Sequence, residues 1–167
     1  MVQIREVGAD GWQAMRDIRL AALRDAPDAF ASTYEREAVF AEADWQRRIA
    51  GRGIFLAYAP ELGTAPAGIA GGFEAEPGTI ELVSMWVTPH ARGHGIGQAL
   101  VETVIGWARA RGISRVHLWV AENNDQARRL YERCGFSPTA ERQPLPSNPA
   151  LIEIGMARNA SESPLEG

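Results

Sequence analysis

Apolar and polar residues recur along the chain in two patterns, which predict where strands and helices lie. Short apolar or alternating runs bounded by turn-forming residues predict strands at 2–7, 54–59, 67–75, 79–87, 115–120 and 150–157. Longer segments with an apolar stripe at helical spacing predict helices at 10–25, 44–51, 96–112 and 124–136. The alternation of these strands and helices along the chain predicts an α/β fold built on a mixed sheet.

The chain contains no internal repeat and no linker, so we expect its 167 residues to form one domain, over 1–158. Residues 28–43 are rich in aromatic and acidic side chains and have no clear period. Residues 159–167 are polar, and we expect them to form a disordered tail.

Composition narrows the classes of protein to consider. Hydrophobic residues make up 46% of the chain, as in ordinary globular proteins, and no apolar stretch reaches the roughly 18 residues of a membrane span. The N-terminus lacks the pattern of a signal peptide, so we expect a cytoplasmic protein. The net charge of −4 argues mildly against a nucleic-acid partner and is compatible with a cationic substrate.

All 17 basic residues are arginines, and the sequence contains no lysine. This excludes catalysis through a lysine Schiff base. It also excludes a P-loop, whose lysine reaches the nucleotide phosphates.

Three glycines at alternate positions, Gly93, Gly95 and Gly97, separate the clearest strand from the clearest helix. A helix N-terminus exposes unpaired amides and the positive end of the helix dipole, which together bind anions. Glycine lets a phosphate approach the backbone and tolerates positive φ. The dinucleotide fingerprint G-x-G-x-x-G does not fit, because Gln98 and Leu100 occupy the third glycine's place. We interpret the loop as a pyrophosphate cradle, with a purely structural turn as the alternative.

Two motifs carry a resemblance to a known family. The run ELVSMWVTPHARGHGIGQALVETVIGWA has an apolar strand ending in Val-x-Pro, a Gln/Arg-x-x-Gly-x-Gly/Ala loop and an amphipathic helix. Downstream, VAENNDQARRLYERCGF has the spacing of the second half of the same signature, at Asn124, Ala127, Leu130, Tyr131, Gly135 and Phe136. Together, over about residues 79–137, they resemble the coenzyme A site of the GNAT superfamily of N-acetyltransferases.

The resemblance implies a single-domain GNAT-like fold, with a mixed central sheet that splays around acetyl-CoA and is flanked by helices. The splay would lie between the strands at 79–87 and 115–120, and the pantetheine arm would pair with the first of them. The implied cofactor contacts are Met85, Trp86, Val87, Arg92, Gly93, His94, Gly95, Ile96, Gly97, Gln98 and Asn124.

The implied reaction is direct transfer of the acetyl group from acetyl-CoA to a primary amine. The Val87 amide is expected to stabilise the charge that develops on the carbonyl oxygen. Tyr131 is expected to protonate the leaving thiolate, since a phenol of ordinary pKa, about 10, can donate to a basic thiolate. By spacing alone Tyr131 is also a core residue of its helix, but the matched distance from Asn124 favours the catalytic role.

The general base is expected to be Glu81. One position that the family uses for a base is filled by Trp119 here, and Glu81 matches the other. In a strand without a bulge, Glu81 would share a face with Met85 and Val87, where apolar neighbours would raise its pKa. A solvated Glu81, with Glu122 or a water chain as the base, is the alternative.

The acceptor is expected to be a small-molecule amine bound by Phe30, Tyr34 and Trp45 and by a loop at 142–150. A protein N-terminus or lysine is the alternative acceptor. A non-catalytic acyl-CoA-binding or sensing domain is the alternative from another class, although such a domain has no reason to keep Tyr131. Membrane and nucleic-acid partners are not expected, and a homodimer is left open.

We expect no metal site. His90 and His94 have i, i+4 spacing, but Pro89 and the glycines disfavour a helix there, and a third ligand is missing. Cys134, the only cysteine, cannot form an internal disulfide and lies on the apolar side of its helix, which indicates buried packing.

Overall fold

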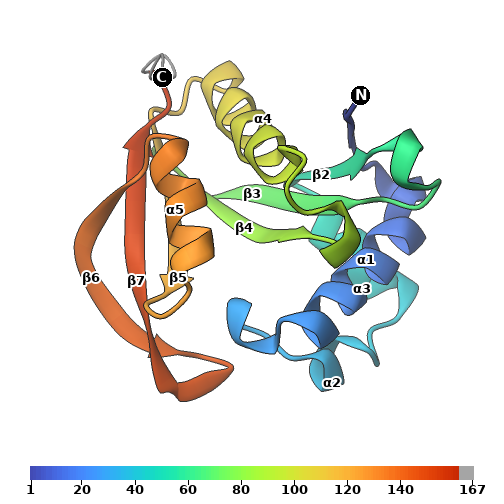
Figure 1. Ribbon diagram of the computed structural model, residues 1–167, viewed down its shortest axis with the longest axis horizontal. Coiled ribbons are helices and arrows are strands. Elements are labelled where there is room, and N and C mark those ends of the chain that lie inside the picture. The colour runs from blue at the N-terminus through green and yellow to red at the C-terminus, as the bar shows by residue number, and fades with distance from the viewer. Residues whose placement is uncertain (162–167) are drawn as a thin grey trace.

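The computed structural model describes residues 1–161, which form a seven-stranded sheet of order β1-β2-β3-β4-β5-β7-β6 flanked by helices (Figure 1). The strands are β1 (Gln3–Glu6), β2 (Gly53–Tyr58), β3 (Gly68–Glu76), β4 (Thr79–Val87), β5 (Arg115–Ala121), β6 (Ser137–Leu145) and β7 (Asn148–Asn159). The α-helices are α1 (Trp12–Asp25), α2 (Tyr34–Glu37), α3 (Glu42–Ile49), α4 (Ile96–Ala110) and α5 (Asp125–Arg133). The predicted α/β fold on a mixed sheet is confirmed.

Strands β4 and β5 form the parallel pair of this sheet, and they pair over a short stretch alone. Thr79–Glu81 lies beside Arg115–His117, and the ladder between the two strands then stops. Beyond that point the strands diverge, and α5 lies near the opening (Figure 1). This is the predicted splay, and it leaves backbone groups of β4 available to a ligand.

Two hydrophobic cores cover the two faces of the sheet. On one face, Leu100 and Val104 of α4 are fully buried. On the other, Met15 of α1 and Trp45 of α3 are buried together with Trp86 of β4. Burying a side chain of this size stabilises the fold by about 1.5–3 kcal/mol, so both faces of β4 are firmly held.

A β-bulge interrupts β4 at Ser84, whose φ of 59° is in the left-handed region. Ile69 of β3 pairs with Trp86, and Gly71 pairs with Val83. Two residues therefore lie between these pairs on β4, but only one lies between them on β3. One extra residue in a strand exchanges the faces of all side chains beyond it.

The bulge overturns one expectation about the site. In a regular strand Leu82 and Trp86, which are four positions apart, would share a face. Here Leu82 belongs to the core beneath α4 and Trp86 to the opposite core. After the bulge it is Met85 and Val87 that pack on the α4 side. The prediction that Glu81 shares a face with Met85 and Val87 is therefore wrong.

Two segments differ from their predicted form. The segment 28–43 contains the short helix α2, whose N-cap Thr33 accepts a hydrogen bond from the amide of Arg36. The expected loop at 142–150 is instead a β-hairpin, formed by the end of β6 and the start of β7. The prolines of β6 hide it from pattern analysis, but β6 is an edge strand, where proline is tolerated.

The last strand continues past the expected boundary at residue 158. β7 ends at Asn159, and Ala160 is fully buried and donates its amide to the carbonyl of Ser114 at 2.7 Å. The rest of the expected tail, 162–167, lies outside the described residues.

Candidate active site

The glycine loop has the backbone geometry that an anion cradle requires. Gly93 and Gly95 have φ of 84° and 77°, which L side chains rarely adopt. Gly97 serves close approach instead, because a Cβ there would lie 3.1 Å from Leu130 Cδ2 and 3.3 Å from Met85 Cε. Gly95 is the N-cap of α4, and no described side chain caps it. The first amides of α4 are therefore free to donate to a ligand.

A cavity of about 450 Å³ extends from this loop to α5 and follows the end of β4. Ten of the eleven expected cofactor contacts line it, namely Met85, Trp86, Val87, Arg92, Gly93, Gly95, Ile96, Gly97, Gln98 and Asn124. The exception is His94, whose Nδ1 lies 3.1 Å from the carbonyl oxygens of Ala91 and Arg92. We call this space the cofactor cavity.

Arg92 joins the loop to α1. Its Nη2 donates to Asp25 Oδ2 at 2.8 Å, and its Nε donates to the carbonyl of Val87 at 3.1 Å. Asp25 also accepts from Trp86 Nε1 at 3.0 Å, and this bond is the main cause that lowers the pKa of Asp25. The sequence gives no signal for Asp25, because its partners are more than 60 positions away.

A second cavity, of about 270 Å³, lies beside the first. Phe30, Glu81 and Trp119 contribute to its lining. Ala29, at the end of the 3-10 turn Pro27–Ala29, lines both cavities, as do Met85 and Tyr131. These shared residues mark a junction between the two, and we call the second space the acceptor cavity.

Tyr131 lies at this junction, on helix α5, and hydrogen bonds close both ends of this helix. At the start of the helix, Asn124 Oδ1 caps α5 by accepting from the amide of Ala127 at 3.2 Å, which leaves its side-chain amide as a donor. At the other end, the carbonyl of Tyr131 accepts from the amide of Phe136 at 3.0 Å. Tyr131 is 7% exposed, and burial raises the pKa of its phenol, so the hydroxyl keeps its proton at neutral pH.

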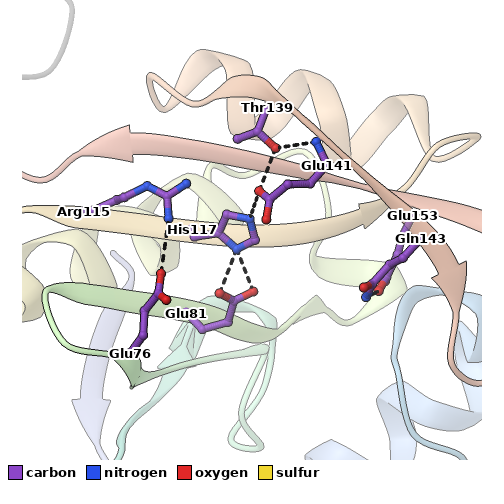
Figure 2. A network of polar contacts seen from close by, with 8 residues as sticks. All are labelled: Glu76, Glu81, Arg115, His117, Thr139, Glu141, Gln143 and Glu153. Atoms are coloured by element: carbon purple, nitrogen blue, oxygen red, sulfur yellow. Dashed lines mark hydrogen bonds and ion pairs between the residues drawn. The ribbon is translucent and has the colours of Figure 1, made fainter.

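Glu81 lines the acceptor cavity and belongs to a polar network that links side chains of β4, β5 and β6 (Figure 2). His117 Nδ1 lies 2.8 Å from Glu81 Oε2 and 3.0 Å from Oε1, and His117 Nε2 lies 2.8 Å from Glu141 Oε1. Glu141 in turn accepts from Thr139 Oγ1 at 2.8 Å. The contact with Glu81 is the main cause that raises the pKa of His117, and with a carboxylate at each nitrogen the ring is best satisfied as an imidazolium.

Room for this network comes from Gly155 on β7. A Cβ at that position would lie 2.6 Å from Thr139 Oγ1, 2.7 Å from Glu141 Oε1 and 2.9 Å from His117 Nε2. The neighbouring Glu153 is buried and accepts from Gln143 Nε2 at 2.6 Å, and burial raises its pKa. Sequence reasoning missed His117, because only the register of β4, β5, β7 and β6 brings its partners together.

The other expected acceptor residues are placed differently from one another. Phe30 lines the acceptor cavity, and the guanidinium of Arg19 stands over its ring, 4.9 Å from the centroid. Tyr34 does not line this cavity, and its hydroxyl accepts from Arg24 Nη2 at 2.6 Å. Trp45 is fully buried in the core beneath α1 and α3, so it offers no surface to a substrate.

Glu122, the alternative base, is bound elsewhere. Its two carboxylate oxygens each accept from Arg142, both at 3.0 Å, and it lines neither cavity. Of these two carboxylates, Glu81 is the one that lines a cavity.

Neither a metal site nor a membrane helix is found in the part of the chain that the structure describes. Within residues 1–161, no group of three or more His, Cys, Asp or Glu side chains is arranged to hold a metal ion. None of the described helices combines the length and the apolar character needed to cross a membrane.

Comparisons with known proteins show the family and the fold of the chain. The sequence profile of the Acetyltransferase (GNAT) family matches residues 12–136. A mycothiol acetyltransferase from Beutenbergia cavernae is 45% identical over 62 residues, which are 37% of this chain and 21% of that protein. The match thus spans about a fifth of the length of this relative.

Solved structures share the fold over nearly the whole chain. A GNAT-family acetyltransferase from Streptococcus pneumoniae superposes with a TM-score of 0.75 at 18% identity, covering 95% of this chain and 99% of that one. A GNAT phosphinothricin acetyltransferase from Sinorhizobium meliloti, solved with acetyl-CoA, gives a TM-score of 0.75 at 19% identity, covering 99% and 94%.

Proposed function

The chain belongs to the acetyltransferase (GNAT) family, and on that premise we propose that it is an acetyl-CoA-dependent N-acetyltransferase that acts directly on the primary amine of a small molecule. The observation that carries the proposal is the junction of the two cavities at Met85 and Tyr131. A cofactor that enters from the glycine loop and an amine in the acceptor cavity would meet there. Proximity of this kind is a large part of catalysis by direct transfer.

The residues present fit coenzyme A. The glycine loop and the free amides of α4 suit a pyrophosphate, and the unpaired part of β4 suits an extended amide-containing arm. Acetyl-CoA supplies an acetyl thioester, whose carbonyl the Val87 amide would polarise. Asn124 has its side-chain amide left to donate to the arm.

Two side chains would move protons. Glu81 would accept the proton that the amine must lose before it attacks, and His117 would hold the Glu81 carboxylate in position. Tyr131 would protonate the thiolate as it leaves, since burial keeps its phenol neutral. A covalent acetyl-enzyme is not needed, and burial raises the pKa of the Cys134 thiol to about 11, which makes that residue a poor nucleophile.

A contact between the β6–β7 hairpin and the segment 28–30 favours a small-molecule acceptor over a protein acceptor. Ser147, in the turn between β6 and β7, donates its hydroxyl to the carbonyl of Phe30 at 2.5 Å. Next to it, Asn148 Nδ2 donates to Asp28 Oδ1 at 3.3 Å. The hairpin and the 28–30 segment thus meet beside the acceptor cavity, whereas a protein substrate needs an open groove for its chain.

An amine screen tests the proposal. Purified protein and acetyl-CoA would be incubated with small primary amines and, separately, with peptides that carry a free N-terminus or a lysine. Free thiol would be followed over time, and products would be identified by mass spectrometry. We expect acetylation of at least one class of small amine. Turnover of peptides alone would contradict the small-molecule acceptor, and coenzyme A binding without acetylation of any amine would favour a sensing domain.

A further inference from the structure

The charges around the acceptor cavity are unequally compensated. Four arginines line it from the α1–α3 side of the molecule, namely Arg19, Arg36, Arg48 and Arg52. On that side Glu37 is the carboxylate that faces them, while Glu81 and Glu153 reach the cavity from β4 and β7. The cavity therefore has an arginine-rich side and a carboxylate side.

Glu37 forms ion pairs with two of the arginines, Arg19 and Arg48. It is fully buried and accepts from Arg19 Nε and Nη2, both at 3.0 Å, and from Arg48 Nη1 at 2.5 Å. Burial alone would raise the pKa of Glu37, but the bonds and charge of Arg19, helped by Arg48, hold it at about 2. Two guanidinium groups thus share one carboxylate, and this trio retains a positive charge.

Arg52 adds to that charge. Its guanidinium stands over the ring of Phe73, 4.4 Å from the centroid, and no carboxylate of residues 1–161 lies within ion-pair distance of it. Burial lowers the pKa of Arg52, and the neighbouring charges of Arg48 and Arg19 lower it further. Arginine nonetheless stays charged, so the site holds an uncompensated cation beside two others, which an anion would stabilise. The exposed Arg36 of α2 also lacks a carboxylate contact among the described residues.

Resting on the proposed function, we propose that the acceptor is a zwitterionic amine, whose carboxylate binds Arg52 and Arg36 while its amino group faces Glu81 and the junction at Tyr131. A planar carboxylate suits the forked donors of arginine, and charge-assisted bonds of this kind are among the stronger polar contacts. The volume of about 270 Å³ suits an amino acid or a compound of similar size. The same polarity would orient the substrate, because a reversed molecule would place like charges together at both ends.

The test uses pairs of acceptors that differ in charge. A panel of α-, β- and γ-amino acids would be assayed with acetyl-CoA, each beside its carboxamide, and kcat/KM would be compared within each pair. Carboxamides have less basic amines, so more of the amine is free at neutral pH and basicity alone favours the amide. We expect the acids to be preferred by roughly 10–100-fold, as for the loss of a charge-assisted bond.

Two variants assign that preference to the cavity. Arg52→Gln should abolish most of the discrimination between acid and amide and leave the KM for acetyl-CoA unchanged. Arg111→Gln is the matched control, because Arg111 also stands over an aromatic ring, Trp107, at 4.3 Å, but lines neither cavity. Arg36→Gln is a second test on an exposed helix, should Arg52→Gln fail to fold, and it should weaken the preference in the same direction.

The outcomes separate this inference from the proposed function. Acetylation of amides or uncharged amines as fast as the matching acids would overturn the zwitterion and leave the acetyltransferase intact. Discrimination that survives both Arg52→Gln and Arg36→Gln would place the anion elsewhere and also overturn it. If no amine at all is acetylated, the proposed function fails, and the zwitterion fails with it.

Discussion

Glu81 and His117 are the last residues paired between β4 and β5, and His117 Nδ1 lies 2.8 Å from the carboxylate of Glu81 at the point where the strands diverge. The same register that ends the ladder therefore positions the candidate base at the mouth of the splay. Glu141, on the other side of the ring at 2.8 Å, keeps the imidazole oriented. The network is thus tied to the opening of the sheet.

Replacing Glu81 tests its role as the base. Glu81→Gln keeps the shape of the side chain but cannot accept a proton, so kcat at neutral pH should fall by about 10²–10⁴-fold. Activity should partly recover as pH rises, because free amine then accumulates without help. The measurement is the pH–rate profile of both proteins at saturating acetyl-CoA. An unchanged profile would mean that water or another group takes the proton.

Replacing His117 tests the network through stability. The pKa of Glu141 is lowered from about 4.5, chiefly by the hydrogen bond from Thr139 and in part by His117. The contribution of the ionised Glu141 to the free energy of unfolding is therefore present above pH 4.5 and is lost as pH falls. The pKa of His117 is raised from 6.5, so its contribution is complete below pH 6.5 and is lost as pH rises past the raised value. Both contributions are therefore present together between pH 4.5 and pH 6.5.

Wild type should therefore exceed His117→Gln in unfolding free energy by about 1–2 kcal/mol between pH 4.5 and 6.5, and by less on either side. Denaturant unfolding at a series of pH values measures this difference. His90→Gln, on an exposed histidine, is the control and should show no such window. A difference that does not vary with pH would mean that His117 acts by packing alone.

Tyr131→Phe removes the candidate acid and keeps the ring in place. We expect kcat to fall by about 10²–10⁴-fold, with acetyl-CoA affinity little changed. The fall should shrink with an acetyl donor whose thiol is more acidic, since that thiolate needs less help to leave. Tyr58→Phe is the matched control, on a tyrosine of β2 outside both cavities. Normal kcat in Tyr131→Phe, with chemistry shown to be rate-limiting, would assign Tyr131 to the core alone.

Gly95→Glu tests the cofactor cradle. It introduces a side chain at a φ of 77° and a negative charge where the pyrophosphate is expected, so affinity for coenzyme A should fall more than tenfold. Titration calorimetry measures this affinity directly. Gly106→Ala, in the same helix with open space around its Cβ, should bind as wild type does and be more stable by about 1 kcal/mol. Equal binding by Gly95→Glu would show that the cradle is misplaced.

Local features of the site could be predicted from the sequence. The positive φ of Gly93 and Gly95 follows from a strand-to-helix turn that only glycine tolerates easily, and the helix of Tyr131 follows from its own caps. These features depend on neighbours within one turn or one loop. A sequence pattern records such short-range requirements well.

Features that depend on pairing across the sheet could not be predicted. The bulge at Ser84 leaves no mark in the alternation of β4, so the face of Glu81 was assigned wrongly relative to Met85. The pair of Arg19 and Glu37 joins residues that are 18 positions apart on different helices. Such contacts depend on register and packing rather than on local propensity.

The central claim, direct transfer at the junction of two cavities, is tested most directly by initial rates measured while acetyl-CoA and the acceptor amine are both varied. Direct transfer through a complex of enzyme and both substrates predicts intersecting lines in double-reciprocal plots. It also predicts no acetylated enzyme by intact mass when acetyl-CoA is added without amine. Parallel lines, together with an acetylated protein that forwards its acetyl group to the amine, would contradict the account.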